Sequence, residues 1–352
     1  MDNSNYGKVC SILEKEPRRW LVTGVAGFIG SNLLEKLLLL GQSVVGLDNF
    51  STGKKENLDQ VEKIVGKERW KNFKFVQADV QDLNICRDVC SDVDLILHQA
   101  AIGSVPRSIE FPADSHAANA TGTLNIFIAA KEKKVKRVVY ASSSAVYGDE
   151  PSLPKVESRI GKPLSPYAAT KLFNEIYAEL FSKLYNIETI GLRYFNVFGP
   201  RQDPDGPYAA VIPKWIASML VNEPVFIYGD GETSRDFCYV ANVIQANILA
   251  ALTTNPDAVN RVYNIAVGQR TTLNQLYFCL KDKLQDTTAG LKIGEPVYKD
   301  FRPGDIRHSL ADISLAKYLL GYQPTHSLQD GLDEALNWYK ENLIKPAANE
   351  KN

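Results

Sequence analysis

Short apolar runs and amphipathic segments alternate along the first half of this 352-residue chain. The stretch Trp20–Asn49 contains an apolar run, a turn with spaced glycines, a leucine-rich segment that stops at Gly41, and a second apolar run at Ser43–Leu47. Apolar residues at helical spacing predict a helix, and short unbroken runs of Val, Ile and Leu predict buried strands. This stretch is therefore predicted to be strand, turn, helix and strand, with Asp48 at the end of the second strand.

The same alternation continues to about residue 195. Strands of Val, Ile, Leu and Phe with little polar alternation are typical of a parallel sheet that helices cover on both faces. We therefore expect an α/β fold built on a doubly wound parallel sheet of the Rossmann type. Its further strands are predicted at Phe73–Gln77, Val93–His98, Arg137–Ala141 and Thr189–Arg193, and its further helices at Leu83–Cys90, Ser115–Lys131 and Pro166–Leu184.

Beyond Gly199 the composition shifts to loop-forming residues, with Pro200, Pro204, Gly206 and Pro207 close together. The later segments look too irregular to continue the doubly wound sheet, so a smaller mixed α/β lobe is predicted at 199–345, with the option that some of its segments return to the first domain. The first domain is placed at 19–198, with an N-terminal extension at 1–18 and a tail at 346–352, and both ends are expected to be poorly ordered. The lobe's predicted helices are Ile212–Val221, Val240–Leu252, Thr272–Leu284, Asp312–Leu319 and Leu328–Leu343, and its predicted strands are Val225–Tyr228, Phe237–Tyr239, Val262–Ala266 and Pro296–Phe301.

Composition and charge narrow the range of partners. The formal net charge is −1, which provides no basic field for nucleic acid and no polybasic surface for lipid. No apolar run reaches the roughly 20 residues that span a bilayer, and the polar N-terminus lacks a signal-peptide core. A cytoplasmic protein without membrane or nucleic-acid partners is expected. The five cysteines and four histidines are scattered, which argues against a disulfide framework and against a metal site.

The three glycines after the first strand, Gly24, Gly27 and Gly30, indicate a dinucleotide site. A tight turn, a close backbone approach to a pyrophosphate and close helix packing each require a residue without a side chain. The phosphates would lie at the helix N-terminus, where unpaired N–H groups collect. Asp48 stands where an acid accepts the hydroxyls of the adenosine ribose and repels a 2′-phosphate, so NAD is favoured over NADP, although Lys54 and Lys55 weaken that preference.

Residues that follow the strands should form the rest of the site, because ligands of such sheets bind at the carboxyl ends of the strands. Asp79 can accept a hydrogen bond from an adenine amino group, and the small Ala100 and Ala101 leave room for the cofactor. The serines 142–144 follow another strand. Their hydroxyls either satisfy loop backbone groups or donate to a substrate oxygen.

Tyr167 and Lys171 stand four residues apart at the start of a predicted helix, which Ser165 and Pro166 are expected to begin. Residues at this spacing share a helical face, so the ammonium can favour the phenolate. Such a pair is common on protein surfaces. Its position after the serine cluster, in a chain with a dinucleotide motif, favours a tyrosine base that works near neutral pH.

These motifs together resemble the extended short-chain dehydrogenase/reductase family, specifically its nucleotide-sugar 4-epimerases. The resemblance rests on TGVAGFIG at 23–30, on SSSAVYG at 142–148, on Tyr167-x-x-x-Lys171 and on LRYFN at 192–196, and it extends from about Trp20 to Tyr339. It implies catalysis by Tyr167, Lys171 and one of the hydroxyls of Ser143 and Ser144, of which Ser143 aligns without an insertion. The first domain would then be the NAD-binding Rossmann domain and the second lobe would bind a UDP-sugar.

The strand ends and the resemblance together predict two sets of ligand-binding residues. The cofactor set is Gly24, Gly27, Phe28, Ile29, Gly30, Asp48, Asn49, Ser51, Thr52, Gly53, Asp79, Val80, Gln99, Ala100, Ala101, Tyr167, Lys171, Tyr194 and Val197. In the substrate set, four residues resemble a clamp on the UDP diphosphate and ribose, for which surface salt bridges are the alternative: Asn196, Arg235, Arg302 and Asp305. The rest of that set is Gly103, Ser104, Arg107, Ser143, Val211, Phe226 and Ser309.

Departures from the family pattern narrow the reaction. Members that dehydrate the sugar carry an Asp–Glu pair after the strand-end hydroxyl, where this chain has Ala145 and Val146. The glutamate of the sugar-acid decarboxylases is also missing. Ser309 falls where glucose/galactose-specific members have a bulky tyrosine, so a small residue there should admit an N-acetyl group. The run Gly103–Ser108 also resembles the subgroup that acts on UDP-N-acetylhexosamines or their uronic acids.

The resemblance thus implies NAD-dependent interconversion of UDP-N-acetylglucosamine and UDP-N-acetylgalactosamine, or of their uronic acids, for surface polysaccharide precursors. UDP-glucose/UDP-galactose 4-epimerisation and another NAD-dependent nucleotide-sugar oxidation are the enzymatic alternatives, and a dinucleotide-sensing protein is the non-enzymatic one. A homodimer is expected by resemblance through the helices Ser115–Lys131 and Pro166–Leu184. The second helix has an apolar stripe, although simple burial on the sheet would also explain it.

Overall fold

The computed structural model describes residues 4–204, 209–301 and 306–343. Within these ranges a sheet of seven strands has the order β11-β6-β5-β4-β1-β2-β3, and every neighbouring pair is parallel. Thr23 of β1 pairs with Leu47 of β2 and His98 of β4, so these strands end at the same edge. The strands are β1 (Arg19–Thr23), β2 (Ser43–Asp48), β3 (Phe73–Gln77), β4 (Leu95–His98), β5 (Arg137–Ser143), β6 (Glu188–Tyr194) and β11 (Arg261–Ile265).

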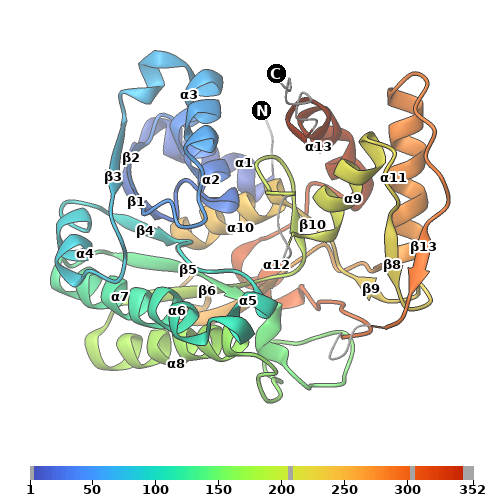
Figure 1. The fold of residues 1–352 in the computed structure, drawn as a ribbon. Coiled ribbons are helices and arrows are strands. Elements are labelled where there is room, and N and C mark those ends of the chain that lie inside the picture. Colours follow the sequence, from blue (N-terminus) through green and yellow to red (C-terminus); the bar gives the residue numbers. More distant parts are fainter. Residues whose placement is uncertain (1–3, 205–208, 302–305, 344–352) are drawn as a thin grey trace.

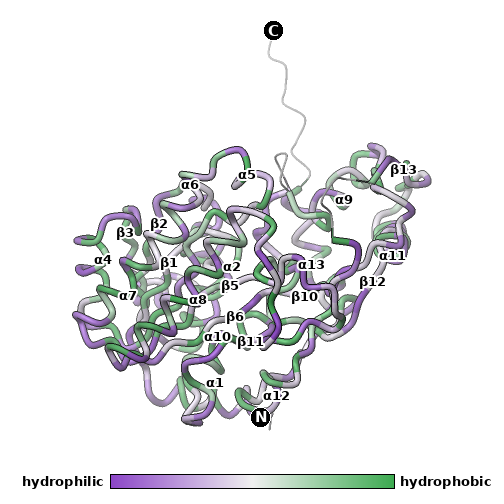
Figure 2. The backbone as a smooth tube through the Cα atoms, turned by 90° about the horizontal axis from the view of Figure 1, so that it is seen from below, coloured by the Kyte–Doolittle hydropathy of each residue, from purple (hydrophilic) through white to green (hydrophobic). Residues whose placement is uncertain are grey.

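Helices cover both faces of this sheet (Figure 1). Alternate residues of one strand face opposite layers, so Trp20 and Val22 belong to one buried cluster and Leu21 to the other. Figure 2 shows hydrophobic and hydrophilic stretches alternating along the helices, as expected for elements with one buried face. One layer contains α1 (Asn5–Lys15), α2 (Phe28–Leu39), α3 (Lys55–Trp70, interrupted at Gly66) and α10 (Val240–Leu252), and the other contains α4 (Leu83–Val89), α7 (Gly122–Glu132) and α8 (Pro166–Tyr185).

Most of the elements after β6 build a smaller region beside the sheet, on the right in Figure 1. Its strands form short pairs: β7 (Val197–Phe198) with β10 (Cys238–Tyr239), β8 (Phe226–Tyr228) with β13 (Val297–Lys299), and β9 (Ser234–Arg235) with β12 (Thr271–Thr272). The helices around them are α9 (Val211–Leu220), α11 (Leu273–Thr287) and α13 (Leu328–Leu343), whereas α12 (Ser314–Leu320) packs against β11 and α10 of the main sheet. In the part of the chain that the structure describes, no helix is long and apolar enough to cross a membrane.

The Rossmann-type fold is confirmed, two later segments return to its main sheet as the sequence analysis allowed, and the expectation about the N-terminal segment was wrong. Segment 261–265 does continue the main sheet as β11, beside β6, and α10 packs on the strands of that sheet. The N-terminal segment is not poorly ordered throughout. Its helix α1 is capped by Ser4, and the buried side chain of Leu13 packs into the core. These are tertiary contacts, which the local sequence pattern does not report.

Besides α1, two helices were missed and one was predicted as too regular. The sequence analysis assigned no helix to α3 or to α5 (Val105–Glu110). The predicted helix Ser115–Lys131 consists of α6 (Pro112–His116), a π-helical turn at Ala117–Thr121 and α7. Helix α8 begins as expected, because the side chain of Ser165 accepts a hydrogen bond from the Ala168 N–H and Pro166 takes the first turn.

Candidate active site

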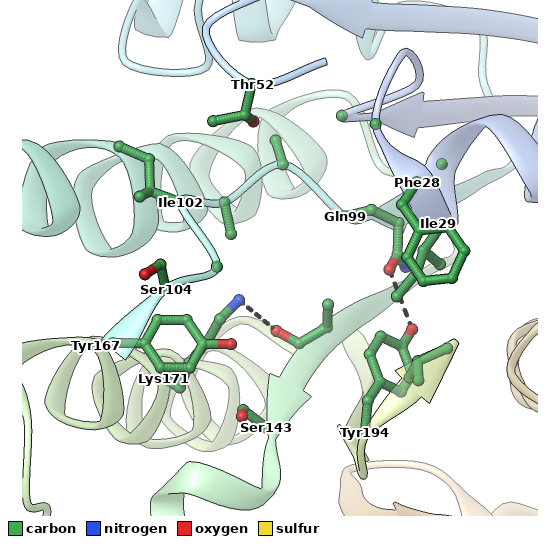
Figure 3. A pocket seen from close by; sticks show the side chains of 18 of the residues that line it. Phe28, Ile29, Thr52, Gln99, Ile102, Ser104, Ser143, Tyr167, Lys171 and Tyr194 are labelled. Atoms are coloured by element: carbon green, nitrogen blue, oxygen red, sulfur yellow. Dashed lines mark hydrogen bonds between the residues drawn. The ribbon is translucent and has the colours of Figure 1, made fainter. Parts of the chain in front are cut away.

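A cavity of about 940 Å³ lies at the carboxyl ends of the parallel strands. The glycine turn, the ends of β2 to β6 and residues of the smaller region all line it. Figure 3 shows Tyr167 between Ser104 and Ser143, with Lys171 close to the tyrosine and Phe28, Gln99 and Tyr194 further along. The position agrees with the rule that ligands bind outside the carboxyl ends of the strands in open α/β sheets.

The glycine turn is packed so tightly that a side chain would not fit. A Cβ on Gly24, whose φ is +65°, would lie 2.8 Å from the Ala100 nitrogen. A Cβ on Gly30 would lie 2.0 Å from the Gly24 oxygen. Gly27 stands at the N-cap of α2, where backbone N–H groups are available to an anion. The turn therefore fits a dinucleotide pyrophosphate.

Asp48 braces the same turn. Its carboxylate accepts hydrogen bonds from the Ala26 N–H at 2.9 Å and the Phe50 N–H at 2.8 Å. Burial raises the pKa of Asp48, and these backbone hydrogen bonds oppose that rise. A Cβ on Gly53 would lie 2.8 Å from the Asp48 carboxylate, so Gly53 is required for packing against the acid and does not line the cavity.

All other residues of the predicted cofactor set line the cavity, which is the arrangement that their proposed role requires. Among them Asn49 donates to the Asp79 carboxylate at 2.7 Å, and the Tyr194 hydroxyl contacts Gln99 at 3.1 Å. Their role in NAD binding stays a prediction. The residues are Gly24, Gly27, Phe28, Ile29, Gly30, Asp48, Asn49, Ser51, Thr52, Asp79, Val80, Gln99, Ala100, Ala101, Tyr167, Lys171, Tyr194 and Val197.

Tyr167 and Lys171 lie on one face of α8 at the centre of the cavity. The Lys171 ammonium is 5.9 Å from the centroid of the Tyr167 ring and donates to the Ala141 carbonyl at 2.8 Å. Burial lowers the pKa of Lys171 to about 8, and the Glu175 carboxylate opposes the fall. Burial raises the pKa of Tyr167, and a hydrogen bond with the Ser143 side chain opposes the rise. The protein alone thus leaves this phenol protonated at neutral pH.

The three serines after β5 have different surroundings. Ser142 is buried and donates to the Glu175 carboxylate at 2.5 Å, so its hydroxyl is engaged in a contact within the protein interior. Ser143 accepts from the Ala145 N–H at 3.1 Å and interacts with Tyr167. Ser144 also lines the cavity. Ser143 is the serine that interacts with the tyrosine, and its catalytic assignment stays a prediction.

The loop after β4, which contains the predicted substrate residues Gly103 and Ser104, is held by Asn119, a residue that the sequence analysis missed. Its side chain accepts from the Ile102 N–H at 2.7 Å and donates to the Ile102 carbonyl at 3.1 Å and to Thr170 at 3.2 Å. The Thr170 hydroxyl donates to the Tyr167 carbonyl at 2.8 Å. Asn119 thereby ties the loop to the first turn of α8. An asparagine within an apparently regular helix provides no sequence signal for such a contact.

The predicted substrate residues divide between two cavities. Gly103, Ser104, Arg107, Ser143, Asn196, Arg235 and Ser309 line the main one. Val211 and Phe226 line a neighbouring cavity of about 320 Å³, which shares Asn196 and Arg235 with the first. The Ser309 N–H donates to the Ser234 carbonyl at 3.0 Å, which places Ser309 beside Arg235. The predicted clamp residues Arg302 and Asp305 lie outside the described ranges.

Two more buried cations at the cavity were missed. Arg201 contacts Ser31 at 3.1 Å, Asn32 at 2.6 Å and Glu35 at 2.7 Å, and so fixes the chain after β7 to α2. Lys155 lines the cavity from the loop before α8. Both residues follow a motif of the site by fewer than ten positions, but neither belongs to the motif itself.

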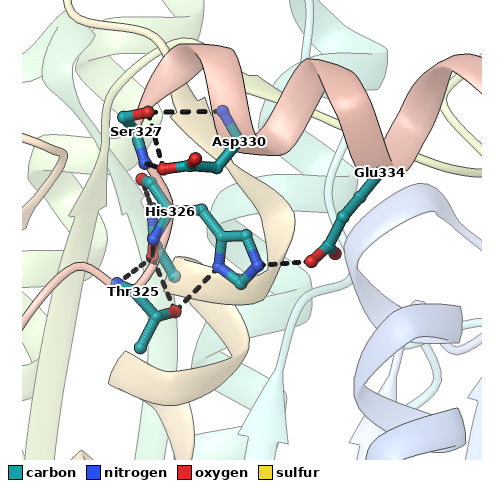
Figure 4. A network of polar contacts seen from close by, with 6 residues as sticks. Thr325, His326, Ser327, Asp330 and Glu334 are labelled. Atoms are coloured by element: carbon teal, nitrogen blue, oxygen red, sulfur yellow. Dashed lines mark hydrogen bonds and ion pairs between the residues drawn. The ribbon is translucent and has the colours of Figure 1, made fainter.

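Two of the four histidines make several hydrogen bonds within the protein. His98 is buried between the hydroxyls of Thr23 at 2.7 Å and Thr123 at 2.9 Å. Burial, followed by the charge of Lys171, lowers its pKa to about 3, so the ring is neutral at physiological pH. His326 lies at the start of α13 and contacts Thr325 and Glu334, far in sequence from the predicted site residues (Figure 4). Among the residues that the structure describes, no group of three or more His, Cys, Asp or Glu side chains could hold a metal ion.

The sequence matches a known family over most of the chain. The model of the NAD dependent epimerase/dehydratase family matches residues 20–266. The chain belongs to this family. The predicted relationship and the predicted NAD cofactor are thereby confirmed.

Relatives in the NAD dependent epimerase/dehydratase family align with most of this chain and with nearly all of their own length. A UDP-glucose 4-epimerase of Mycolicibacterium smegmatis is 34% identical, with 92% of this chain and 98% of the relative covered. The structure of a UDP-N-acetylglucosamine 4-epimerase from Methanobrevibacter ruminantium, in complex with UDP-N-acetylmuramic acid, is 40% identical, with a TM-score of 0.83 and coverage of 92% and 99%. A UDP-glucuronic acid 4-epimerase from Bacillus cereus, in complex with UDP-glucuronic acid and NAD, is 31% identical, with a TM-score of 0.80 and the same coverage.

Proposed function

We propose that the protein is an NAD-dependent 4-epimerase of UDP-N-acetylhexosamines, which interconverts UDP-N-acetylglucosamine and UDP-N-acetylgalactosamine. The observation that carries this proposal is the single cavity in which the glycine turn, the Ser143–Tyr167–Lys171 group and Ser309 meet. The relatives named above are 4-epimerases of UDP-sugars, which supports the reaction and the nucleotide. The N-acetyl preference rests on Ser309 and on the run Gly103–Ser108.

In the proposed reaction Tyr167 takes the proton from the 4-hydroxyl of the sugar. NAD, when bound, supplies an acceptor for the C4 hydride and returns it, so the net redox change is zero. Lys171 by its charge and Ser143 by its hydrogen bond would favour the phenolate together with the positive charge that bound NAD adds, because the protein alone leaves the phenol protonated. Arg235 at the other end holds the diphosphate while the 4-keto sugar turns and presents its other face.

Substrate size is proposed to be set at Ser309. A serine there leaves open the space that a tyrosine would fill, and an acetamido group at C2 needs that space. UDP-glucose/UDP-galactose 4-epimerisation is the alternative that the name of the M. smegmatis relative favours. Ala145 and Val146 after the serines provide no acid or base for dehydration.

One incubation separates these reactions. Purified protein is mixed with UDP-N-acetylglucosamine, the nucleotide sugars are resolved, and reduced cofactor is followed by absorbance. The proposal expects UDP-N-acetylgalactosamine without accumulation of NADH. Stoichiometric NADH would instead indicate a net dehydrogenase, and a protein that binds NAD but no UDP-sugar would indicate a dinucleotide sensor.

We also propose a homodimer formed through α8. Ile176, Leu180 and Leu184 recur every fourth residue on this helix and are 49%, 43% and 67% exposed. The other members of the predicted stripe, Phe173 and Tyr177, pack against each other with centroids 4.3 Å apart. A second copy covering the exposed three would remove apolar surface from water. Leu180→Asp should halve the mass measured by light scattering, and a monomeric wild type would contradict the proposal.

Cytoplasmic location and a role in supplying surface polysaccharide precursors stay proposals from the sequence.

A further inference from the structure

The backbone of Tyr167 is held by a serine from another part of the chain. Tyr167 lies in the first turn of α8, where backbone N–H groups have no partner within the helix. The side chain of Ser165 accepts a hydrogen bond from the Ala168 N–H, which is the usual contact of an N-cap residue. The Tyr167 N–H instead donates to the hydroxyl of Ser108 at 3.0 Å, a residue 59 positions earlier in the chain. Ser108 therefore completes the cap of α8 from outside the helix.

The Ser108 side chain has a fixed direction. The residue belongs to α5 and is 0% exposed. Its hydroxyl donates to the Val105 carbonyl at 2.7 Å, and its backbone N–H donates to the Ser104 carbonyl at 3.0 Å. A hydroxyl has one donor and two lone pairs, so a Ser108 that donates to Val105 can still accept from Tyr167. The first turn of α8 is thereby joined to α5.

Helix α5 also contributes to the cavity. Its N-cap residue Ser104 and its last turn with Arg107 both line the cavity, and both are predicted to contact the substrate. Figure 3 shows Ser104 beside Tyr167. Ser108 is not among the described residues that line the cavity. One short helix thus faces the predicted sugar position with two residues and holds the Tyr167 backbone with a third.

The carbonyl of Tyr167 is tied to the same loop by a second route. It accepts a hydrogen bond from the Thr170 hydroxyl at 2.8 Å. Asn119 donates to Thr170 at 3.2 Å and accepts from the Ile102 N–H at 2.7 Å. Both polar groups of the Tyr167 backbone are therefore connected to the loop after β4, the N–H directly and the carbonyl through two side chains.

We propose that Ser108 is a positioning residue, which holds Tyr167 where its phenol reaches both Ser143 and the sugar that α5 contacts. This role rests on the proposed function, in which Tyr167 takes the proton of the sugar 4-hydroxyl. A general base must lie within hydrogen-bond reach of the proton that it accepts. Ser143 lies on β5 and Lys171 on α8, so a shift of α8 against the sheet would stretch the contact of Tyr167 with Ser143 first. That contact opposes the rise in the pKa of Tyr167, and its loss would leave less phenolate.

The test compares Ser108→Ala with the matched control Ser165→Ala. Each substitution removes one hydrogen bond from the first turn of α8, so the two variants should lose similar amounts of melting temperature. The Ser165 bond lies within α8 and moves with it, whereas the Ser108 bond fixes α8 to the loop. The kcat for 4-epimerisation of UDP-N-acetylglucosamine should therefore fall about tenfold in Ser108→Ala and less than about twofold in Ser165→Ala. Binding of this nucleotide sugar, measured by calorimetry, should change little in either variant.

The pKa of Tyr167 provides a second readout that does not depend on turnover. It is followed by NMR titration of isotope-labelled tyrosine in the NAD-loaded protein, and the Tyr167 signal is the one that disappears in Tyr167→Phe. Ser108→Ala should raise this pKa, and Ser165→Ala should leave it near the wild-type value. Because the base acts as phenolate, the acid limb of the profile of kcat against pH should move to higher pH in Ser108→Ala alone.

Two outcomes would overturn the role of Ser108. Equal losses of kcat in the two variants would make Ser108 an ordinary structural cap, as would an unchanged pKa of Tyr167 in Ser108→Ala. A wild type that converts no UDP-sugar would instead refute the proposed function. In that case the NMR titration by itself decides whether Ser108 positions the phenol, because it requires neither substrate nor turnover.

Discussion

The two ends of the main cavity are built in different ways. The cofactor end comes largely from one continuous stretch, in which β1, the glycine turn, α2 and β2 follow each other within residues 19–48. The substrate end brings together residues as far apart as Ser104, Lys155, Arg235 and Ser309. A pyrophosphate site needs backbone shape, which a local motif specifies. A site that selects one sugar needs several side chains around it, and only the folded chain collects them.

Tyr167→Phe changes the residue that lies where the two ends of the cavity meet. It should have the largest effect on kcat. Loss of the proton acceptor should lower kcat on the order of 10³-fold, because positioned general bases contribute effects of this size. Binding of UDP-N-acetylglucosamine, measured by calorimetry, should change little. A variant that keeps most of its turnover would remove Tyr167 from the mechanism.

Glu175→Gln tests the buried carboxylate that pairs with Arg193 and lies one turn along α8 from Lys171. Glu175 pairs with Arg193 through hydrogen bonds of 2.9 and 2.7 Å and accepts from Ser142. Leaving the guanidinium without its partner should cost about 3 kcal/mol of unfolding free energy in urea. The control is Glu179→Gln, one turn further along α8, where the exposed carboxylate contacts Lys183. Its effect should stay below about 1 kcal/mol.

Glu175→Gln should also shift the alkaline limb of the profile of kcat against pH. The pKa of Lys171 is about 8, and the charge of Glu175 holds it up against burial. Without that negative charge the pKa falls further, so the ammonium is lost at lower pH. The pH above which kcat declines should therefore move down in Glu175→Gln. An unchanged or upward-shifted limb would show that Glu175 does not act on Lys171.

Gly30→Ala tests the cofactor end alone. The added Cβ would lie 2.0 Å from the Gly24 oxygen, so the turn must open. We expect a loss of about 2 kcal/mol in stability, as for other overpacked sites, and a lower NAD content in the purified protein. Gly294→Ala is the control, because a Cβ there meets nothing within 4 Å. Full NAD content in Gly30→Ala would mean that the turn does not hold the cofactor.

Ser309→Tyr tests the substrate end alone and should have the smallest effect. The ratio of kcat/KM for UDP-N-acetylglucosamine over UDP-glucose should fall about tenfold, which corresponds to ~1.4 kcal/mol. Ser309→Ala keeps the space and should keep the ratio. If the tyrosine leaves the ratio unchanged, the N-acetyl group lies elsewhere and the proposed role of Ser309 is wrong.

The sequence predicted the elements of the main sheet well where hydrophobic pattern and local signals agreed. The start of α8 is an example, since Ser165 and Pro166 specify it within one turn. It did not place β11, whose five residues do not reveal that β6, about 70 residues earlier, is their neighbour. Nor did it show that Gly53, which follows β2, packs against Asp48 without lining the cavity.

The sequence by itself determined the Rossmann-type fold, the family and NAD as the cofactor, because these depend on periodicity and on short motifs. It also placed Tyr167 and Lys171 on one helical face, since four residues make about one turn. Only the tertiary structure decided that Ser142 serves Glu175 while Ser143 interacts with Tyr167. It alone brought Asn119 to Ile102 and Lys155 to Ala311. These contacts join segments that are distant along the chain, and no local pattern encodes which distant segments will meet.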